Sequence, residues 1–223
     1  MKISNKRDLD PIGRTEKKPF GIQHNPLDYY TPNYLSPDRM SSYSYQYSLA
    51  LETGACTFLN IGSANSILKY LLEKNDVHVI DLDLDWNTKP NVSAALPFLP
   101  FSDKSIDVVM CFQILEHLPL IMFGATIKEL KRVAKEFILL SLPDQTITNS
   151  QRLKYFIYKT FNRPVEWNIY KLRQIDTEHF WEIGHSNISD FAIVNMIKNE
   201  NLEIIKDFRN QNNRFHHFFV VKV

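Results

Sequence analysis

The sequence lacks several features that would define a function class at once. No apolar run approaches the roughly 20 residues that a membrane-spanning helix needs, and the polar start Met-Lys-Ile-Ser-Asn-Lys-Arg is unlike a secretory signal. The net charge is only +1, from 26 basic and 25 acidic residues, so no strong electrostatic footprint for nucleic acid is present. We therefore expect a cytoplasmic protein with no membrane span and no nucleic-acid partner.

Cysteine and glycine are scarce as well. The two cysteines, Cys56 and Cys111, lie in or beside predicted buried strands, which favours core thiols in a reducing compartment over a disulfide or a metal pair. Six glycines are present, and Gly62 is the one glycine in the turn GSANS. The dinucleotide fingerprint Gly-x-Gly-x-x-Gly is therefore absent, which argues against a nucleotide-binding oxidoreductase.

What the sequence does contain is an alternation of strand-like and helix-like segments. Apolar residues make up 44% and charged residues 23% of the 223 residues, which is typical of a globular domain with a sizeable core. The alternation predicts a parallel sheet with helices on both faces, and the short turn at 209–213 predicts an antiparallel hairpin. The expected strands are 57–61, 77–81, 91–95, 107–112, 136–142, 202–208 and 215–222, and the expected helices are 41–52 (capped by Ser41), 65–74, 121–134 and 188–199.

Two stretches fall outside this alternation. Residues 1–38 are rich in Lys, Asp, Pro and Asn, which is typical of an extended arm. Residues 143–187 are long, aromatic and basic, and they follow the carboxyl end of a strand, which is the ligand-binding edge of such a sheet. We expect an N-terminal arm and helix at 1–52, and one domain at 53–223 with a lid-like insert at 143–187 over a substrate pocket.

The stretch from Thr57 to Leu118 carries the chemistry. The turn at Gly62 follows a strand and opens a helix, so it presents backbone N–H groups to a ligand. An acid at the tip of the next strand can accept hydrogen bonds from ribose hydroxyls. In the run IDLDLD, Asp81, Asp83 and Asp85 share one side of the strand, and a solvated turn suits Asp85 best. No histidine or further acid stands at ligand spacing, so no metal site is expected.

Further segments follow in a fixed order. They are LPFSDKSIDVVMCFQILEHL at 99–118, then ELKRVAKEFILLSLPD, HFWEIG and FHHFFVVKV. With the glycine turn, this series resembles class I S-adenosylmethionine-dependent methyltransferases of the small-molecule branch termed type 11, over about residues 40 to 223. The resemblance implies a Rossmann-like, seven-stranded α/β sheet with an antiparallel last strand. It also implies S-adenosylmethionine as the cofactor.

The resemblance further implies which residues meet that cofactor. Gly62 allows close approach of the backbone, and Asp81 matches the ribose-binding acid, with Asp83 in competition. Ala95 stands where an acid usually faces the adenine. Residues directly after the fourth strand are expected to line the methyl end. The full set is Asn60, Ile61, Gly62, Ser63, Asp81, Leu82, Asp83, Ala95, Leu96, Phe112 and Gln113.

Methyl transfer depends mainly on alignment of acceptor, methyl group and sulfur, and an oxygen acceptor also needs a base. His117, His179 and Glu182 are the candidates for catalysis, although each can instead serve packing. His216 and His217 fall in the last strand, so one is expected to face inward and the other outward.

We therefore expect methyl transfer from S-adenosylmethionine to a small-molecule or carbohydrate-like acceptor. One alternative is a binding module of the same fold, whose altered glycine turn no longer holds the cofactor. A nucleotide-binding oxidoreductase is the less favoured alternative.

Overall fold

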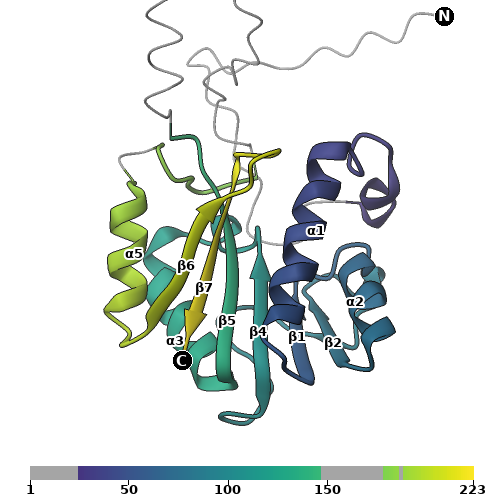
Figure 1. Cartoon of the computed structure of the whole chain (residues 1–223), viewed down its shortest axis with the longest axis horizontal. Helices are drawn as coiled ribbons and strands as arrows, with labels where there is room; N and C mark the ends of the chain where they lie inside the picture. Colours follow the sequence, from purple (N-terminus) through teal and green to yellow (C-terminus); the bar gives the residue numbers. More distant parts are fainter. Residues whose placement is uncertain (1–24, 147–177, 186–187) are drawn as a thin grey trace, which may run out of the picture.

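The computed structural model describes residues 25–146, 178–185 and 188–223. Within them, one seven-stranded sheet has the order β3-β2-β1-β4-β5-β7-β6 (Figure 1). All neighbouring strands are parallel except β7, which runs antiparallel to both β5 and β6. The predicted α/β sheet with its antiparallel last strand is thus confirmed. The strands are β1 (Thr57–Ile61), β2 (His78–Asp83), β3 (Val92–Ser93), β4 (Ile106–Phe112), β5 (Ala134–Pro143), β6 (Glu203–Arg209) and β7 (His216–Lys222).

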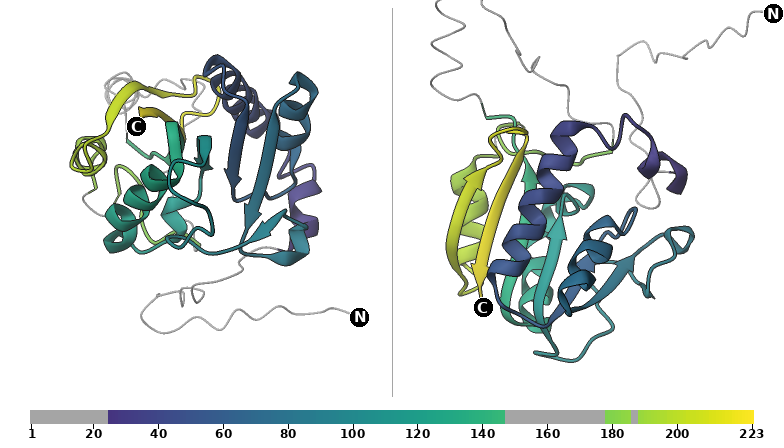
Figure 2. Two further views of the ribbon diagram at one scale, coloured as in Figure 1. Left: turned by 90° about the horizontal axis from the view of Figure 1, so that it is seen from below. Right: turned by 45° about the vertical axis from the view of Figure 1, so that its right-hand side comes forward.

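Helices cover both faces of the sheet, as Figure 2 shows from below. On one face, α1 (Pro37–Glu52) and α2 (Ile67–Leu72) share a core with buried side chains of β1, β2 and β4. On the other face, α3 (Phe123–Val133) and α5 (Asp190–Lys198) pack on a larger core. Because both faces are covered, β4 is buried at six of its seven positions and reads as a continuous apolar run.

Five short 3-10 helices connect these elements within the described residues. They are η1 (Pro26–Tyr30), η2 (Glu73–Asn75), η3 (Trp86–Thr88), η4 (Leu115–His117) and η5 (Leu120–Met122). None of the described helices is long and apolar enough to cross a membrane.

Helix α1 begins four residues earlier than expected. Ser36, not Ser41, is the N-cap, and its side chain accepts a hydrogen bond from the backbone N–H of Arg39. Pro37 at the first helical position and Asp38 in the first turn complete a start signal that is stronger than Ser41 alone. Ser41 instead donates to the carbonyl of Asp38.

The segment before β1 is bound closely to the rest of the fold. Leu49 and Ala50 of α1 are buried against Phe58 of β1. Asn210, in the loop between β6 and β7, donates from its amide to Ser42 Oγ at 3.0 Å. The arm expected at 1–38 lies largely outside the described residues, and the division into 1–52 and 53–223 stays a prediction.

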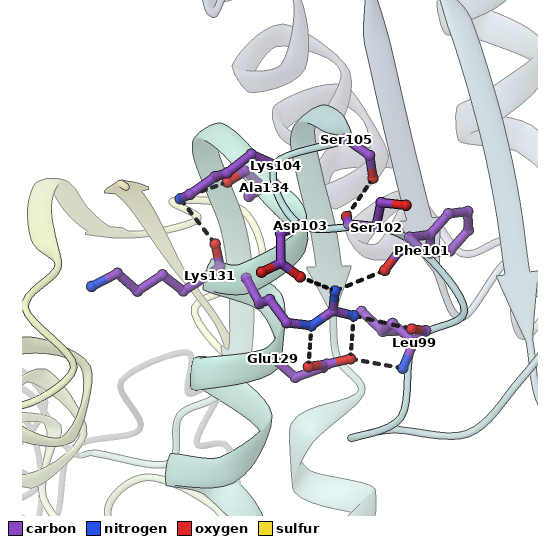
Figure 3. A network of polar contacts seen from close by, with 10 residues as sticks. Leu99, Phe101, Ser102, Asp103, Lys104, Ser105, Glu129, Lys131 and Ala134 are labelled. Carbon is purple, nitrogen blue, oxygen red and sulfur yellow. Dashed lines mark hydrogen bonds and ion pairs between the residues drawn. The ribbon is translucent and has the colours of Figure 1, made fainter.

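Arg132 of α3 fixes the loop that follows β3, and Figure 3 labels its partners Leu99, Phe101, Asp103 and Glu129. Its guanidinium pairs with Glu129 and Asp103 and donates to the carbonyls of Leu99 and Phe101. Glu129 in turn accepts from the backbone N–H of Leu99. A planar, multidentate cation holds several acceptors in one geometry. The segment Leu99–Phe101 therefore acts as an anchor outside the site, and it positions residues 94–96.

The two cysteines differ from each other. Cys111 of β4 is buried, as expected, and burial raises the pKa of its thiol. Cys56 is exposed, so its interpretation as a core thiol was wrong, because it precedes β1 rather than lying within the strand. Both thiols are free.

Candidate active site

A cavity of about 850 Å³ lies at the carboxyl ends of β1, β2 and β4. This is the edge at which open α/β sheets bind ligands. Ten of the eleven residues expected to meet a cofactor line it, and only Asp81 does not. The ten are Asn60, Ile61, Gly62, Ser63, Leu82, Asp83, Ala95, Leu96, Phe112 and Gln113.

Asp81 does not line the cavity, although its neighbours Asn60 and Leu82 do. Its two carboxylate oxygens accept hydrogen bonds from the Asn60 amide at 2.8 Å and from Ser66 Oγ at 2.6 Å. Burial raises the pKa of Asp81, against the effect of these two bonds. Asp81 therefore contacts the residues on either side of the glycine turn, and its expected ribose contact stays a prediction.

Asp83 is the acid at the rim. Its carboxylate accepts from Ser63 Oγ at 3.2 Å and from the backbone N–H of Ala64 at 3.3 Å, and it lines the cavity. Asp85 is buried rather than solvated, because its carboxylate caps η3 by accepting from the N–H of Asn87. The interpretation of Asp85 as a solvated acid was wrong.

Gly62 occupies a position that only glycine fits. Its φ is +79°, and its N–H donates to the carbonyl of Leu82 at 2.8 Å. A Cβ built there would lie 2.1 Å from Cδ1 of Ile114. The glycine turn is thus shaped both by its backbone conformation and by the side chain that follows β4.

We expect Gly62→Ala to weaken cofactor binding and also to lower stability, by about 1–2 kcal/mol from the left-handed φ alone. In Gly62→Ala/Ile114→Ala the steric conflict is gone and the φ strain remains. Denaturant unfolding and calorimetric titration of both variants, with Ile114→Ala as the control, separate the two costs. Equal stability of Gly62→Ala and the native chain would contradict this account.

At the other end of the cavity, two histidines and a glutamate come together. His117 of η4 and His179 both line the cavity, and their rings are 4.8 Å apart at 82°. Glu116 directly precedes His117, has a fully buried side chain, and offers a ligand atom within 4.8 Å of one on each histidine. Burial raises its pKa to about 7. Within the described part of the chain, neither oxygen of Glu116 has a hydrogen-bond partner.

Glu182 does not line the cavity. It is fully buried, and one of its oxygens lies 2.6 Å from Nδ1 of His179. The other oxygen accepts from the amide of Gln145. Of the three expected catalytic groups, His117 and His179 therefore reach the cavity, and Glu182 orients His179 from behind.

The N-terminal segment supplies a wall of the cavity. Tyr29, Tyr34, Arg39 and Tyr43 all line the cavity, and the segment before α1 lies above α2 in Figure 1, where the amide of Asn65 donates to the carbonyl of Tyr29. Arg39 stacks on the Tyr34 ring with its guanidinium carbon 4.2 Å from the ring centroid. The run of tyrosines between 29 and 47 was the available signal.

Both histidines of β7 are buried, so the expected outward face is not solvent. His216 lines the cavity, and burial lowers its pKa to about 3. His217, on the other face, contacts Asp144 and Asp207. The face of β7 that carries His217 is covered, because Phe219 and Val221 on the same face lie in the core with residues of α3 and α5.

The ends of the insert lie at the cavity edge. Asp144 forms a parallel bridge with Ile183 just beyond β5, and Glu178 and His179 line the cavity. Trp181 is a core anchor, since it packs on Phe123 and its indole N–H donates to the carbonyl of Leu118. Most of the expected lid, residues 147–177, lies outside the described residues.

Comparisons with known proteins agree with this geometry. Residues 59–137 match the family model of a methyltransferase domain. No curated protein sequence matches the chain. Similar solved structures include magnesium protoporphyrin IX methyltransferase from Synechocystis PCC 6803 with bound S-adenosylhomocysteine, at TM-score 0.58 and 14% identity, over 83% of each chain. A methyltransferase from Archaeoglobus fulgidus gives TM-score 0.59 and 14% identity, over 88% of this chain and 99% of that one. At such identities these likenesses show the fold alone.

The strand order and the helices on both faces are those of the class I methyltransferase fold. Residues 59–137 carry a methyltransferase domain, and the rest of the described chain completes the fold that S-adenosylmethionine-dependent methyltransferases share.

Proposed function

We propose that this enzyme transfers the methyl group of S-adenosylmethionine to a small-molecule acceptor held in the cavity described above. The observation that carries the proposal is the single cavity that joins the glycine turn and Asp83 at one end to His117 and His179 at the other. A volume of about 850 Å³ falls within the range of small-molecule sites. The walls combine tyrosine rings with charged groups, which suits a carbohydrate-like or ring-bearing acceptor.

In this proposal each end of the cavity has its own task. The backbone at Gly62, Ser63 and Ala64 receives the methionine part of the cofactor, and Asp83 accepts from the ribose hydroxyls. Ala95 and Leu96 flank the adenine, with their loop anchored by Arg132. Phe112 and Gln113 then face the methyl group, since they follow β4 at the cavity edge.

The acceptor would approach from the histidine end. Methyl transfer is a displacement at carbon, so holding the acceptor atom in line with the C–S bond supplies much of the rate. His117 or His179 can take the proton of a hydroxyl acceptor. The carboxylate of Glu182, at 2.6 Å from His179 Nδ1, favours the tautomer with its lone pair on Nε2.

Calorimetric titration with S-adenosylmethionine and S-adenosylhomocysteine tests the proposal. We expect saturable one-to-one binding of both, because cofactor and product share every contact except the methyl group. Titration with NAD is the control for the oxidoreductase alternative, and no binding is expected. Absence of binding by both sulfur ligands would contradict the proposal and favour a binding module that has lost its cofactor.

A further inference from the structure

Three groups at the histidine end of the cavity have the make-up of a metal site. One ligand atom each from Glu116, His117 and His179 lies within 4.8 Å of the other two. In a tetrahedral site with bonds of about 2.0–2.2 Å, neighbouring ligand atoms lie about 3.3–3.6 Å apart. The three side chains therefore need to close by at most about 1.5 Å to share one ion.

The carboxylate of Glu116 is the second, independent observation. Its side chain is fully buried and neither oxygen has a hydrogen-bond partner among the described residues. A buried carboxylate without partners is costly, and such groups are normally paired or bound to a metal. Glu116 is held in place by its backbone, since its carbonyl accepts from the N–H of Phe180 at 2.8 Å.

Both histidines are oriented by acceptors on Nδ1. His117 Nδ1 lies 3.2 Å from the carbonyl of Glu178, and His179 Nδ1 lies 2.6 Å from the carboxylate of Glu182. Because a carbonyl and a carboxylate can only accept, each Nδ1 donates, and the lone pair of each neutral ring is then on Nε2. A carboxylate behind a ligating histidine is the arrangement that metal sites use to fix the ring and raise its basicity.

We propose that Glu116, His117 and His179 bind one divalent first-row transition-metal ion at the acceptor end of the cavity, with Glu182 positioning His179. Two imidazoles with one carboxylate suit such ions, whereas Mg²⁺ prefers oxygen ligands. Three protein ligands leave coordination positions open toward the cavity. This inference rests on the proposed function for its role, and it makes the two histidines ligands in place of proton acceptors: an acceptor hydroxyl bound at an open position would lose its proton to solvent more readily. Its oxygen then attacks the methyl carbon while the C–S bond breaks.

The sequence did not indicate this site. The proposed ligands come from two segments that are about 60 residues apart, and these meet because the chain returns to the end of β5 through the Asp144–Ile183 bridge.

The test is equilibrium dialysis of the tag-free, chelator-treated chain against Zn²⁺, with the bound metal counted. We expect one Zn²⁺ per chain and no comparable uptake of Mg²⁺. Glu116→Gln and His117→Ala should each weaken Zn²⁺ binding at least tenfold, and Glu182→Gln should weaken it by about 10- to 100-fold through His179. His78→Ala, which removes an exposed histidine at the start of β2, is the matched control and should change nothing.

Glu116→Gln is decisive because it keeps the shape of a buried side chain and so is expected to fold, which thermal unfolding verifies. Substoichiometric uptake, or equal uptake by Glu116→Gln and the native chain, would overturn the proposal. Titration of the metal-free native chain with S-adenosylhomocysteine runs in parallel. Zn²⁺ binding without cofactor binding would contradict the proposed function alone. Cofactor binding without Zn²⁺ binding would contradict the metal site alone.

Discussion

Asp83→Asn is expected to weaken S-adenosylhomocysteine binding by roughly 10- to 150-fold. A hydroxyl hydrogen bond to a charged acceptor contributes about 1.5–3 kcal/mol, which corresponds to that range of affinity. Both carboxylates of β2 accept hydrogen bonds at each oxygen, but Asp83 lines the cavity and Asp81 does not. Calorimetric titration of the variant gives the affinity directly.

A ligand pair separates ribose contact from support of the turn, because Asp83 also accepts from Ser63 and Ala64. The native chain should prefer adenosine to 2′,3′-dideoxyadenosine in competition with the cofactor, and Asp83→Asn should lose that preference. Asp76→Asn is the control, since Asp76 is an exposed acid that does not line the cavity. A larger loss of the preference for adenosine in Asp81→Asn would indicate that Asp81, and not Asp83, accepts from the ribose hydroxyls.

Asp144→Ala is expected to lower the free energy of unfolding by about 3–5 kcal/mol. Its side chain is fully buried and pairs with Arg209 at 2.6 Å and with His217 Nδ1 at 2.8 Å. Burial alone would raise the pKa of Asp144, but hydrogen bonds from His217 and Thr146 and the charge of Arg209 lower it overall. Removal of the carboxylate leaves Arg209 and His217 without their buried partner, which is the costly case for a buried ion pair.

The matched control is Asp190→Ala. Asp190 is a half-exposed carboxylate that lies 3.7 Å from the same arginine. Exposed pairs contribute about 0–1 kcal/mol, so denaturant unfolding should show a small change. Similar losses for the two variants would mean that burial of Asp144 does not decide its contribution.

Much of the fold could be predicted because its strands differ from their surroundings in local composition. The seven strands and the antiparallel hairpin follow from apolar runs and a short turn. The choice among Asp81, Asp83 and Asp85 could not be made in the same way. A period of two places all three on one side of the strand, and only the pairing of Ile61 with Leu82 shows where the strand reaches the edge of the sheet.

The site was predictable at its cofactor end and not at its acceptor end. The glycine turn and the tip of β2 are close in sequence, so local order indicates them. The meeting of Glu116 with His179, and the wall made by Tyr29 and Arg39, depends on distant segments of the chain. No local pattern reports which buried side chain will be left without a partner.

The hydrogen bond between Asn210 and Ser42 has a consequence for synthesis of the protein. These residues are 168 positions apart, and β7 enters the sheet between two strands made before it. Contacts of such long separation form late and slowly. On the ribosome, the glycine turn and β1 to β5 can assemble while the cavity still lacks the side formed by Asn213 and His216. The enzyme should therefore acquire its complete ligand site only after β7 has emerged from the ribosome. Cofactor binding then cannot stabilise the nascent chain at earlier stages.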